Sequence, residues 1–422
     1  TRSINATIDA LWRMESPKII GALARLVRDV GLAEELAQDA LVAALQQWPD
    51  EGLPANPAAW LMMTAKRRAI DRFRRDRMIR EKSREVAGDL DAREDVATKM
   101  IEAHMDDDIG DERLALIFAA CHPELGREAR TALTLRLLGG LTPPEIARAF
   151  LSSETTIQQR IVRAKKTLRD TDAQFEVPHG RARNERLKAV LEVIYLIFNE
   201  GYSATSGGDW MRPQLCGEAQ RLGRIVAELM PEEAEALGLL SLMELQASRF
   251  GARVDAHGNP ILLADQNRAR WDRLLIRRGL AVLDRASTIS NGPGGPYQIQ
   301  AAIAACHARA GANEDTDWLK IAALYAALMQ QTPSPVIELN RAVAISMALG
   351  PEHGLAIIDD LADEPALKSY HLLPAVRGDL LEKLGRRPEA AAEFDQAAKL
   401  AANEREIQLL SARARAARGK LN

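Results

Sequence analysis

Residues 141–170, LTPPEIARAFLSSETTIQQRIVRAKKTLRD, constrain the fold of this chain more than any other segment. Thr142 is placed to cap a short helix, with two prolines at the first helical positions and Glu145 completing a capping box. Ser153 is placed to cap a second helix after a tight turn. The segment therefore predicts a helix-turn-helix.

The second of these helices has two different faces. An apolar stripe at helical spacing is expected to be buried, and it consists of Ile157, Ile161, Ala164 and Leu168. The opposite face carries Thr155, Gln158, Gln159, Val162, Arg163 and Lys166. Side chains of this kind on an exposed helix can read base edges in the major groove of DNA. A solvated face in an ordinary helical bundle is the alternative, but DNA binding is the favoured interpretation.

The composition extends the helical prediction to the whole chain. Aromatic residues make up only 4% of the 422 residues, whereas hydrophobic residues make up 47%. This balance favours helices packed through small and aliphatic side chains, in two to four domains. The formal net charge of -3 restricts any nucleic-acid surface to a local patch. We expect an all-α protein.

The three cysteines give no sign of a metal site or a disulfide. Cys121, Cys216 and Cys306 lie far apart, without metal-ligand spacing, and are expected to be buried thiols in a reducing compartment. No cofactor motif is present. No apolar run is long enough to span a bilayer, and the N-terminus does not resemble a signal peptide. We therefore expect a cytoplasmic protein without metal, cofactor or membrane contact.

Periodicity divides the chain into helical blocks. Residues 5–78 form a first block, and residues 79–110 read as a flexible acidic linker. Residues 111–172 form a second block that ends with the helix-turn-helix. Residues 185–420 are again helical, interrupted by turn-rich segments.

The first block contains a strong helix start at Asn56 and Pro57. On one side of this helix we expect buried residues, namely Ala58, Met62, Ala65, Ala69 and Phe73. The other side carries Trp60, Thr64, Arg67, Asp71 and Arg74. An exposed tryptophan beside arginines can stack on unpaired bases while the cations bind phosphates. Packing of the tryptophan against a neighbouring helix is equally compatible with the pattern.

The preceding segment, GLAEELAQDALVAALQQW, is also amphipathic. Leu36, Ala40 and Ala44 are in register, and the outer face is acidic and polar, with Glu34, Glu35, Gln38 and Asp39. Such a face can dock on a basic partner helix or simply be solvated.

Near the C-terminus, residues 375–400 contain a repeat-like unit. Small and aromatic residues fall at tetratricopeptide-like offsets, namely Gly378, Leu381, Gly385, Ala390, Phe394 and Ala397. Residues 318–350 form a looser helical pair. A helical-repeat domain is expected, with an irregular helical bundle as the alternative.

Together these segments resemble the extracytoplasmic-function (ECF) branch of the sigma-70 family of RNA polymerase sigma factors. AEELAQDALVAAL resembles the region 2 helix that binds polymerase, which implies polymerase contacts by Leu36, Gln38 and Asp39. NPAAWLMMTAKRRAIDRFRRDR resembles the helix that opens and reads the −10 element, and the helix-turn-helix resembles region 4, which reads the −35 element. The sequence segments FNEGY and LLADQNRARWD resemble those of a subgroup with a C-terminal tetratricopeptide-like extension.

The resemblance implies a promoter-specificity subunit without covalent chemistry. Its expected partners are promoter DNA and core polymerase, through the clamp region of the β′ subunit and the flap of the β subunit, with an intramolecular contact of the C-terminal domain as a further expectation. Two residues depart from the family pattern. Arg67 replaces a common asparagine, so we expect it to contact a phosphate. Gln158 replaces a common basic residue, and glutamine prefers adenine edges.

Two other functions fit parts of the pattern. One is a ligand-responsive helix-turn-helix regulator that binds DNA without polymerase. The other is an enzyme in the C-terminal half, for which the candidates are Glu200, Asp209, His257 and Asp265. No nucleophile–base arrangement or phosphate-binding loop supports the enzyme.

Overall fold

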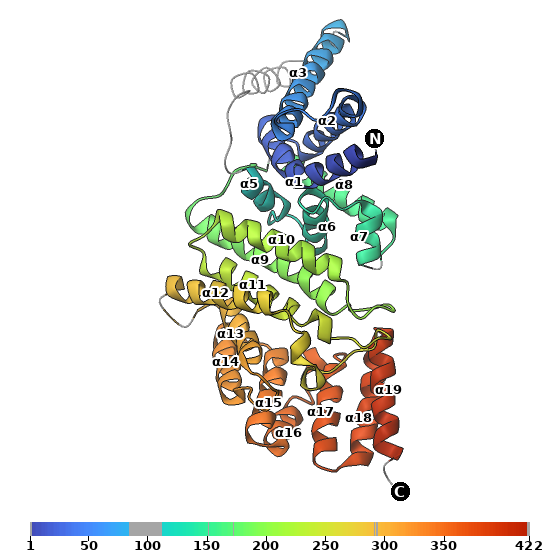
Figure 1. The fold of residues 1–422 in the computed structure, drawn as a ribbon, viewed down its shortest axis with the longest axis vertical. Helices are drawn as coiled ribbons and strands as arrows, with labels where there is room; N and C mark the ends of the chain where they lie inside the picture. The colour runs from blue at the N-terminus through green and yellow to red at the C-terminus, as the bar shows by residue number, and fades with distance from the viewer. Residues whose placement is uncertain are drawn as a thin grey trace. The chain divides into compact units, whose positions relative to one another are not determined.

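The computed structural model describes residues 2–83, 112–150, 152–171, 173–290, 292 and 294–419. Within these ranges the regular elements are helices, and the only β-type pairings are two isolated bridges. The chain divides into two compact units, Thr1–Leu196 and Ile197–Asn422 (Figure 1). The all-α prediction is confirmed. Most of the acidic segment predicted at 79–110 lies outside the described residues.

The first unit begins with three long helices that pack on one another: α1 (Arg2–Val27), α2 (Val30–Glu51) and α3 (Pro57–Ser83). Asp29 caps α2, because its Oδ1 atom accepts hydrogen bonds from the amides of Gly31 and Leu32 at 2.7 and 3.1 Å. Leu23 and Leu36 belong to the core of this unit.

Four shorter helices follow in the first unit: α5 (Glu112–Ala120), α6 (Arg127–Leu137), α7 (Pro143–Ala149) and α8 (Glu154–Asp170). The predicted capping box is present, since the amide of Thr142 donates to Glu145 Oε2 at 2.7 Å. Ser153 caps α8 by accepting from the amide of Thr156 at 3.0 Å. The helix-turn-helix, with both of its caps, is therefore confirmed.

Helix α9 (Gly180–Tyr202) crosses the boundary between the two units. The second unit continues with α10 (Pro213–Leu229) and α11 (Ala234–Ala247). Residues 248–272 are irregular and contain the 3-10 turns η1 (Phe250–Ala252), η2 (Leu263–Asp265) and η3 (Arg268–Arg270). Helices α12 (Arg273–Ser290) and α13 (Pro296–Arg309) follow, and both pack on α11.

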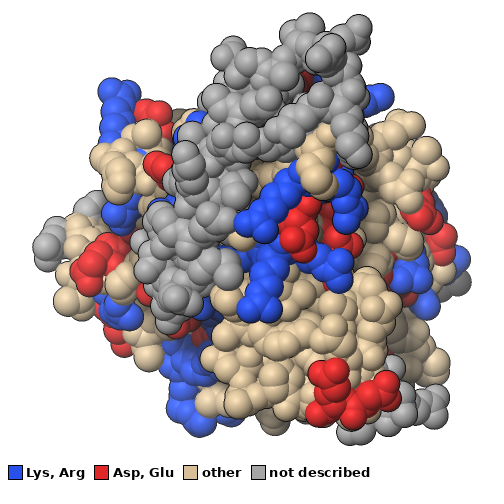
Figure 2. All heavy atoms as spheres, turned by 90° about the horizontal axis from the view of Figure 1, so that it is seen from above, with Lys and Arg blue, Asp and Glu red and all other residues tan. Residues whose placement is uncertain are grey.

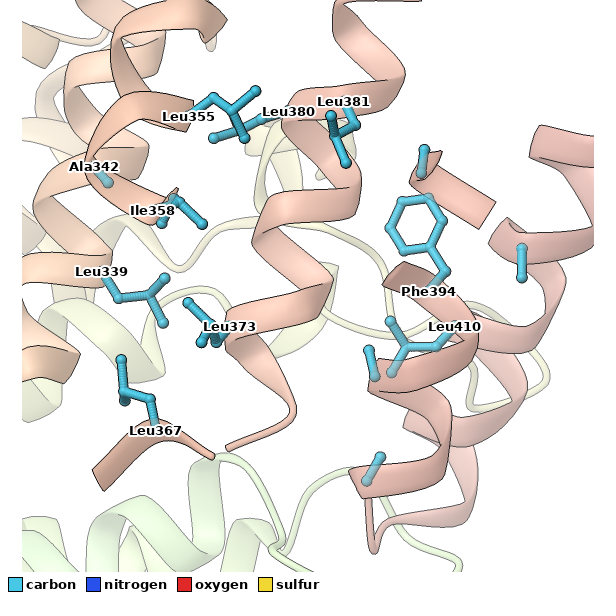
Figure 3. Close-up of a cluster of buried hydrophobic side chains, with 14 residues drawn as sticks. Leu339, Ala342, Leu355, Ile358, Leu367, Leu373, Leu380, Leu381, Phe394 and Leu410 are labelled. Atoms are coloured by element: carbon cyan, nitrogen blue, oxygen red, sulfur yellow. The ribbon is translucent and has the colours of Figure 1, made fainter. Parts of the chain in front are cut away.

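The last part of the second unit is a series of helices in which each helix packs on its neighbour in sequence. These helices are α14 (Trp318–Gln331), α15 (Pro335–Leu349), α16 (Pro351–Asp360), α17 (Leu372–Lys383), α18 (Arg387–Leu400) and α19 (Glu404–Gly419), with the turn η4 (Pro365–Leu367) before α17. Their apolar side chains point into a shared core that runs from α15 to α19 (Figure 3).

Phe394 occupies the position predicted for it, between two helices of this series. Its side chain is fully buried, and a Cβ atom built on Gly378 would lie only 2.8 Å from the phenyl ring. The helices α17 and α18 approach closely because Gly378 has no side chain. The helical C-terminal extension is confirmed, whereas its tetratricopeptide-like character remains a prediction based on this packing.

Candidate nucleic-acid interface

Helix α8 separates its two faces as predicted. The apolar stripe is buried, with Ile157, Ile161, Ala164 and Leu168 each at most 5% exposed. All six residues of the predicted reading face are exposed: Thr155, Gln158, Gln159, Val162, Arg163 and Lys166.

Val162 shows how open this face is. It is apolar and yet 65% exposed, so the fold does not need it in the core. The amide of Gln158 donates to Glu154 Oε1 at 2.8 Å, which orients its side chain along the helix surface. The arrangement offers amide, hydroxyl and guanidinium groups on one continuous helix face.

Helix α3 exposes three of the five residues predicted for the −10 reader. Arg67, Asp71 and Arg74 are exposed, whereas Thr64 is half-buried. Trp60 is also half-buried, and its ring lies edge-on to Trp48 of α2, with ring centroids 5.2 Å apart. The tryptophan therefore packs against a neighbouring helix, which was the alternative to full exposure.

Basic side chains gather on this end of the first unit. Seen from the end where α3 lies in Figure 1, lysines and arginines surround a smaller group of acidic residues (Figure 2). On α3, Arg72 lies close to two carboxylates, that of Asp76 at 3.2 Å and that of Glu35 at 4.0 Å. The surface is a local patch, as the net charge requires.

The buried side of α3 differs in register from the prediction. Leu61 and Ile70 belong to the core together with the predicted Ala65, Ala69 and Phe73. Ala58 and Met62 are only half-buried, so their prediction as core residues was wrong. The observed buried face of α3 is rotated around the helix axis relative to the predicted one, because α3 packs on both α1 and α2.

Helix α2 exposes Gln38 and Asp39 but buries Leu36, which is only 3% exposed. Leu36 therefore cannot make the predicted surface contact in this structure and serves as a core residue. The reason is geometric, because residues two positions apart point about 200° apart around a helix. Leu36 and Gln38 cannot share one face.

Two apolar residues that the sequence analysis missed extend the exposed side of α2. Val42 is 50% exposed and Leu45 is 38% exposed. Both fall at helical spacing from Gln38, so the three side chains lie along one side of α2. The same spacing, counted from Gln38 instead of Leu36, would have identified them.

Glu34 connects the first helical block to the helix-turn-helix block. Its carboxylate accepts from Arg136 of α6 at 2.6 Å and pairs with Lys165 of α8. The side chain of Glu34 is only 8% exposed, and those of its partners are 20% and 23% exposed. Docking on a basic helix, one of the two predicted roles for this acidic face, is therefore observed for Glu34.

A second ion pair lies beside the first. Asp29, which caps α2, also pairs with Arg169 of α8 at 3.2 Å. Glu35 and Asp39 do not take part and remain exposed. The first one and a half turns of α2, from Asp29 to Glu34, thus bind α8 through ion pairs.

The cysteines are buried and free, as expected. Burial raises the pKa of Cys121 and of Cys216 to about 12, so both thiols stay protonated.

The residues considered for an enzyme lie in different surroundings, and Asp209 is exposed. Glu200 is held by Arg212 and by the hydroxyl of Thr205, and His257 and Asp265 are exposed on the irregular segment 248–272. In the described ranges no three His, Cys, Asp or Glu side chains are grouped to hold a metal ion. No described helix is both long and apolar enough to cross a membrane.

Family models match three parts of the chain. Sigma-70 region 2 matches residues 11–78, and sigma-70 region 4 matches residues 115–168. A family of unknown function, DUF6596, matches residues 186–287. No solved structure matches the chain.

Curated relatives fall into two groups. An uncharacterized protein of Rhizobium meliloti is 46% identical over 401 residues, which cover 94% of this chain and 93% of that protein. The ECF RNA polymerase sigma factor SigK of Mycobacterium ulcerans is 30% identical over 155 residues, which cover 36% of this chain and 79% of that protein. SigK of Mycobacterium bovis BCG is 28% identical over the same length. With regions 2 and 4 in order, the chain belongs to the ECF family of RNA polymerase sigma factors.

Proposed function

We propose that the chain reads the −35 element of a promoter through α8 and the −10 element through α3. The observation that carries this proposal is the face of α8. Five polar or basic side chains and Val162 are exposed there, opposite the buried apolar stripe. On α3, the exposed Arg67 and Arg74 suit phosphate contacts. Trp60, half-buried beside Trp48, retains part of its surface for stacking on a base.

Core polymerase binds, in this proposal, to the exposed side of α2. Gln38 and Asp39 supply polar contacts, while Val42 and Leu45 supply apolar area. The partner of this face is the clamp region of the β′ subunit, and region 4 contacts the flap of the β subunit. The protein acts in the cytoplasm as a specificity subunit and performs no catalysis itself.

The contact between α2 and α8 belongs to the polymerase-free form. Both α3 and α8 pack on α2. The axes of two packed helices lie about 10 Å apart, so the axes of α3 and α8 are separated by about 20 Å. The −35 and −10 elements of a promoter are centred about 25 base pairs apart, which corresponds to about 85 Å along B-DNA. One compact unit cannot reach both elements at once, so the ion pairs of Glu34 and Asp29 must break when a promoter is bound.

Polymerase binding supplies the cause of this opening. Glu34 Oε1 accepts a hydrogen bond from Gln38 Nε2 at 3.1 Å, so the α8-contacting residue adjoins the proposed polymerase face. A partner that covers Gln38 and the residues beside it competes with α8 for the same side of α2. The C-terminal unit, in turn, regulates or supports this step.

Transcription with purified core polymerase tests the proposal. We expect promoter-dependent transcripts and a footprint over both elements. Gln158→Arg should move the base preference at one −35 position from adenine toward guanine, by about tenfold. Lack of promoter-dependent transcription with core enzyme would refute the function, and binding of duplex DNA by the chain alone would instead favour a polymerase-independent regulator.

A further inference from the structure

Three arginines on the irregular segment 248–272 of the second unit gather around two aromatic rings. The guanidinium carbon of Arg253 lies 3.4 Å from the ring centroid of Tyr202, and that of Arg249 lies 5.6 Å from the same ring. Arg249 also faces Trp271 at 5.9 Å, and Arg268 faces Trp271 at 4.7 Å. Arg249 thus stands between the other two, and we call the three residues the arginine cluster.

The hydrogen bonds of Arg249 and Arg253 go to neutral acceptors. Arg253 donates through Nη1 to the backbone oxygen of Tyr202 at 2.5 Å. Arg249 donates through Nη2 to the hydroxyl of Tyr202 and to the side-chain oxygen of Gln246. The other guanidinium nitrogens of these two arginines donate to no described residue.

Arg268 is bonded in the same way. Its Nη1 donates to the backbone oxygens of His307 at 2.5 Å and of Ala310 at 3.0 Å, and its Nη2 donates to the hydroxyl of Thr316 at 3.2 Å. All three arginines are therefore anchored by uncharged groups.

No carboxylate of the described residues forms an ion pair with the arginine cluster. Other arginines of the second unit do have such partners, since Arg212 pairs with Glu200, and Arg224 and Arg278 share Glu244. Two acidic residues near the cluster, Glu314 and Asp315, act on Arg268 only from beyond ion-pair distance.

Burial makes this excess of positive charge costly. Arg253 and Arg268 are each only 7% exposed. Desolvation, together with the neighbouring Arg249, lowers the pKa of both guanidinium groups. Close burial of like charges is unfavourable unless an opposite charge joins them.

Polar atoms without partners lie at the same place. Trp271 is only 3% exposed, and its Nε1–H group has no acceptor in the described structure. The Nδ1 atom of His307 is likewise buried without a partner. An indole N–H can only donate, so the missing group beside the cluster is an acceptor.

We propose that the arginine cluster, together with the indole N–H of Trp271, is a binding site for a small oxyanion, either a carboxylate or a phosphate. Such a group accepts several charge-assisted hydrogen bonds at once from guanidinium donors. The burial of Arg253 and Arg268 suits a small anion better than the surface of a macromolecule. The site would make the second unit of this sigma factor responsive to a metabolite.

Isothermal titration calorimetry on the full-length protein tests the site. Inorganic phosphate and succinate are titrated separately at ionic strength fixed with sodium chloride, which distinguishes the two chemical sources. We expect saturable binding of one of them. Arg249→Gln should weaken that binding by about tenfold to hundredfold, because it removes the central charge.

Two further variants separate binding from structure. Arg278→Gln, which removes an arginine that has a carboxylate partner, should bind the anion like the parent protein. Trp271→Phe keeps the ring but removes the donor, so it should weaken binding even if Arg249→Gln fails to fold. Without ligand, a folded Arg249→Gln should be as stable as the parent, since it relieves repulsion between like charges. Absence of saturable binding of either anion, or binding by Trp271→Phe and by a folded Arg249→Gln as tight as that of the parent protein, would overturn the proposal.

Discussion

Replacing Glu34 by glutamine should release the helix-turn-helix block from α2. Glu34 carries the negative charge of a three-residue ion-pair group, with Arg136 and Lys165 as its partners. Glutamine has nearly the same shape and retains one acceptor oxygen, but it removes the charge. The two cations are then left facing each other at a site where about four fifths of each side chain is covered.

The expected magnitude follows from this burial. Removing one partner of a fully buried ion pair costs about 3–5 kcal/mol, whereas an exposed pair contributes at most about 1 kcal/mol. Arg136 and Lys165 keep 20% and 23% of their side-chain surface in water, so the cost lies between these limits, at about 2 kcal/mol. A change of that size shifts the equilibrium toward the open form by about 30-fold.

Energy transfer between two fluorophores measures this shift in the full-length protein. Engineered cysteines at the exposed Glu51 and Asp170 place one fluorophore on α2 and one on α8. The native cysteines are buried, and burial raises the pKa of each thiol, so they should not compete for a maleimide label. Transfer efficiency should fall in Glu34→Gln.

Glu35→Gln is the matched control, with the same change one residue along the same helix. Its carboxylate is exposed, and among the described residues its one ion-pair partner is Arg72, at 4.0 Å, so this variant should leave the efficiency unchanged. Equal efficiencies for the parent protein and Glu34→Gln would refute the reasoning, as would equal opening by the two variants.

The other predictions concern the remaining surfaces and cores. Leu45→Asp should weaken binding to core polymerase by at least tenfold, measured by fluorescence anisotropy, and should leave unfolding in urea unchanged. Leu36→Ala should instead lower the free energy of unfolding by about 2–4 kcal/mol, because it leaves a cavity in the core. Gly378→Ala should lower that free energy by about 1–3 kcal/mol, since the new methyl group meets the ring of Phe394. Burial, helped by two nearby arginines, lowers the pKa of His307 to about 4. Because the unfolded chain takes up this proton near pH 6.5 and the folded chain does not, stability should fall as the pH drops from 6.5 toward 4, and His307→Gln should remove that part of the dependence.

The fold of the helix-turn-helix could be predicted because its determinants are local. Caps such as Thr142 and Ser153 act within four residues, and the stripe from Ile157 to Leu168 has an unambiguous helical period. The same holds for Gly378 and Phe394, where a missing side chain and a large one occur at a fixed offset.

The errors arose where several helices share a surface. Helix α3 packs on both α1 and α2, so periodicity alone could not decide whether Met62 or Ile70 belongs to the core. The environment of Glu34 depends on residues more than 100 positions later, and its sequence neighbourhood is the same whether it is solvated or paired. The arginine cluster lies on segment 248–272, but the backbone groups that anchor it come from Tyr202 of α9 and His307 of α13, which no spacing rule connects.

Substitution of the opposite partner separates opening of the unit from loss of a polymerase contact. Glu34 adjoins Gln38, so weaker polymerase binding by Glu34→Gln could result from direct damage to the docking face. Lys165 lies on α8 and outside the proposed reading face, and its ion pair is with Glu34. Lys165→Gln should therefore open the unit while leaving α2 intact, and it should raise the apparent affinity for core polymerase, because less of the protein is held in the closed form. If Lys165→Gln opens the unit and polymerase binds no more tightly, the contact between α2 and α8 does not compete with polymerase, and the opening must have another cause.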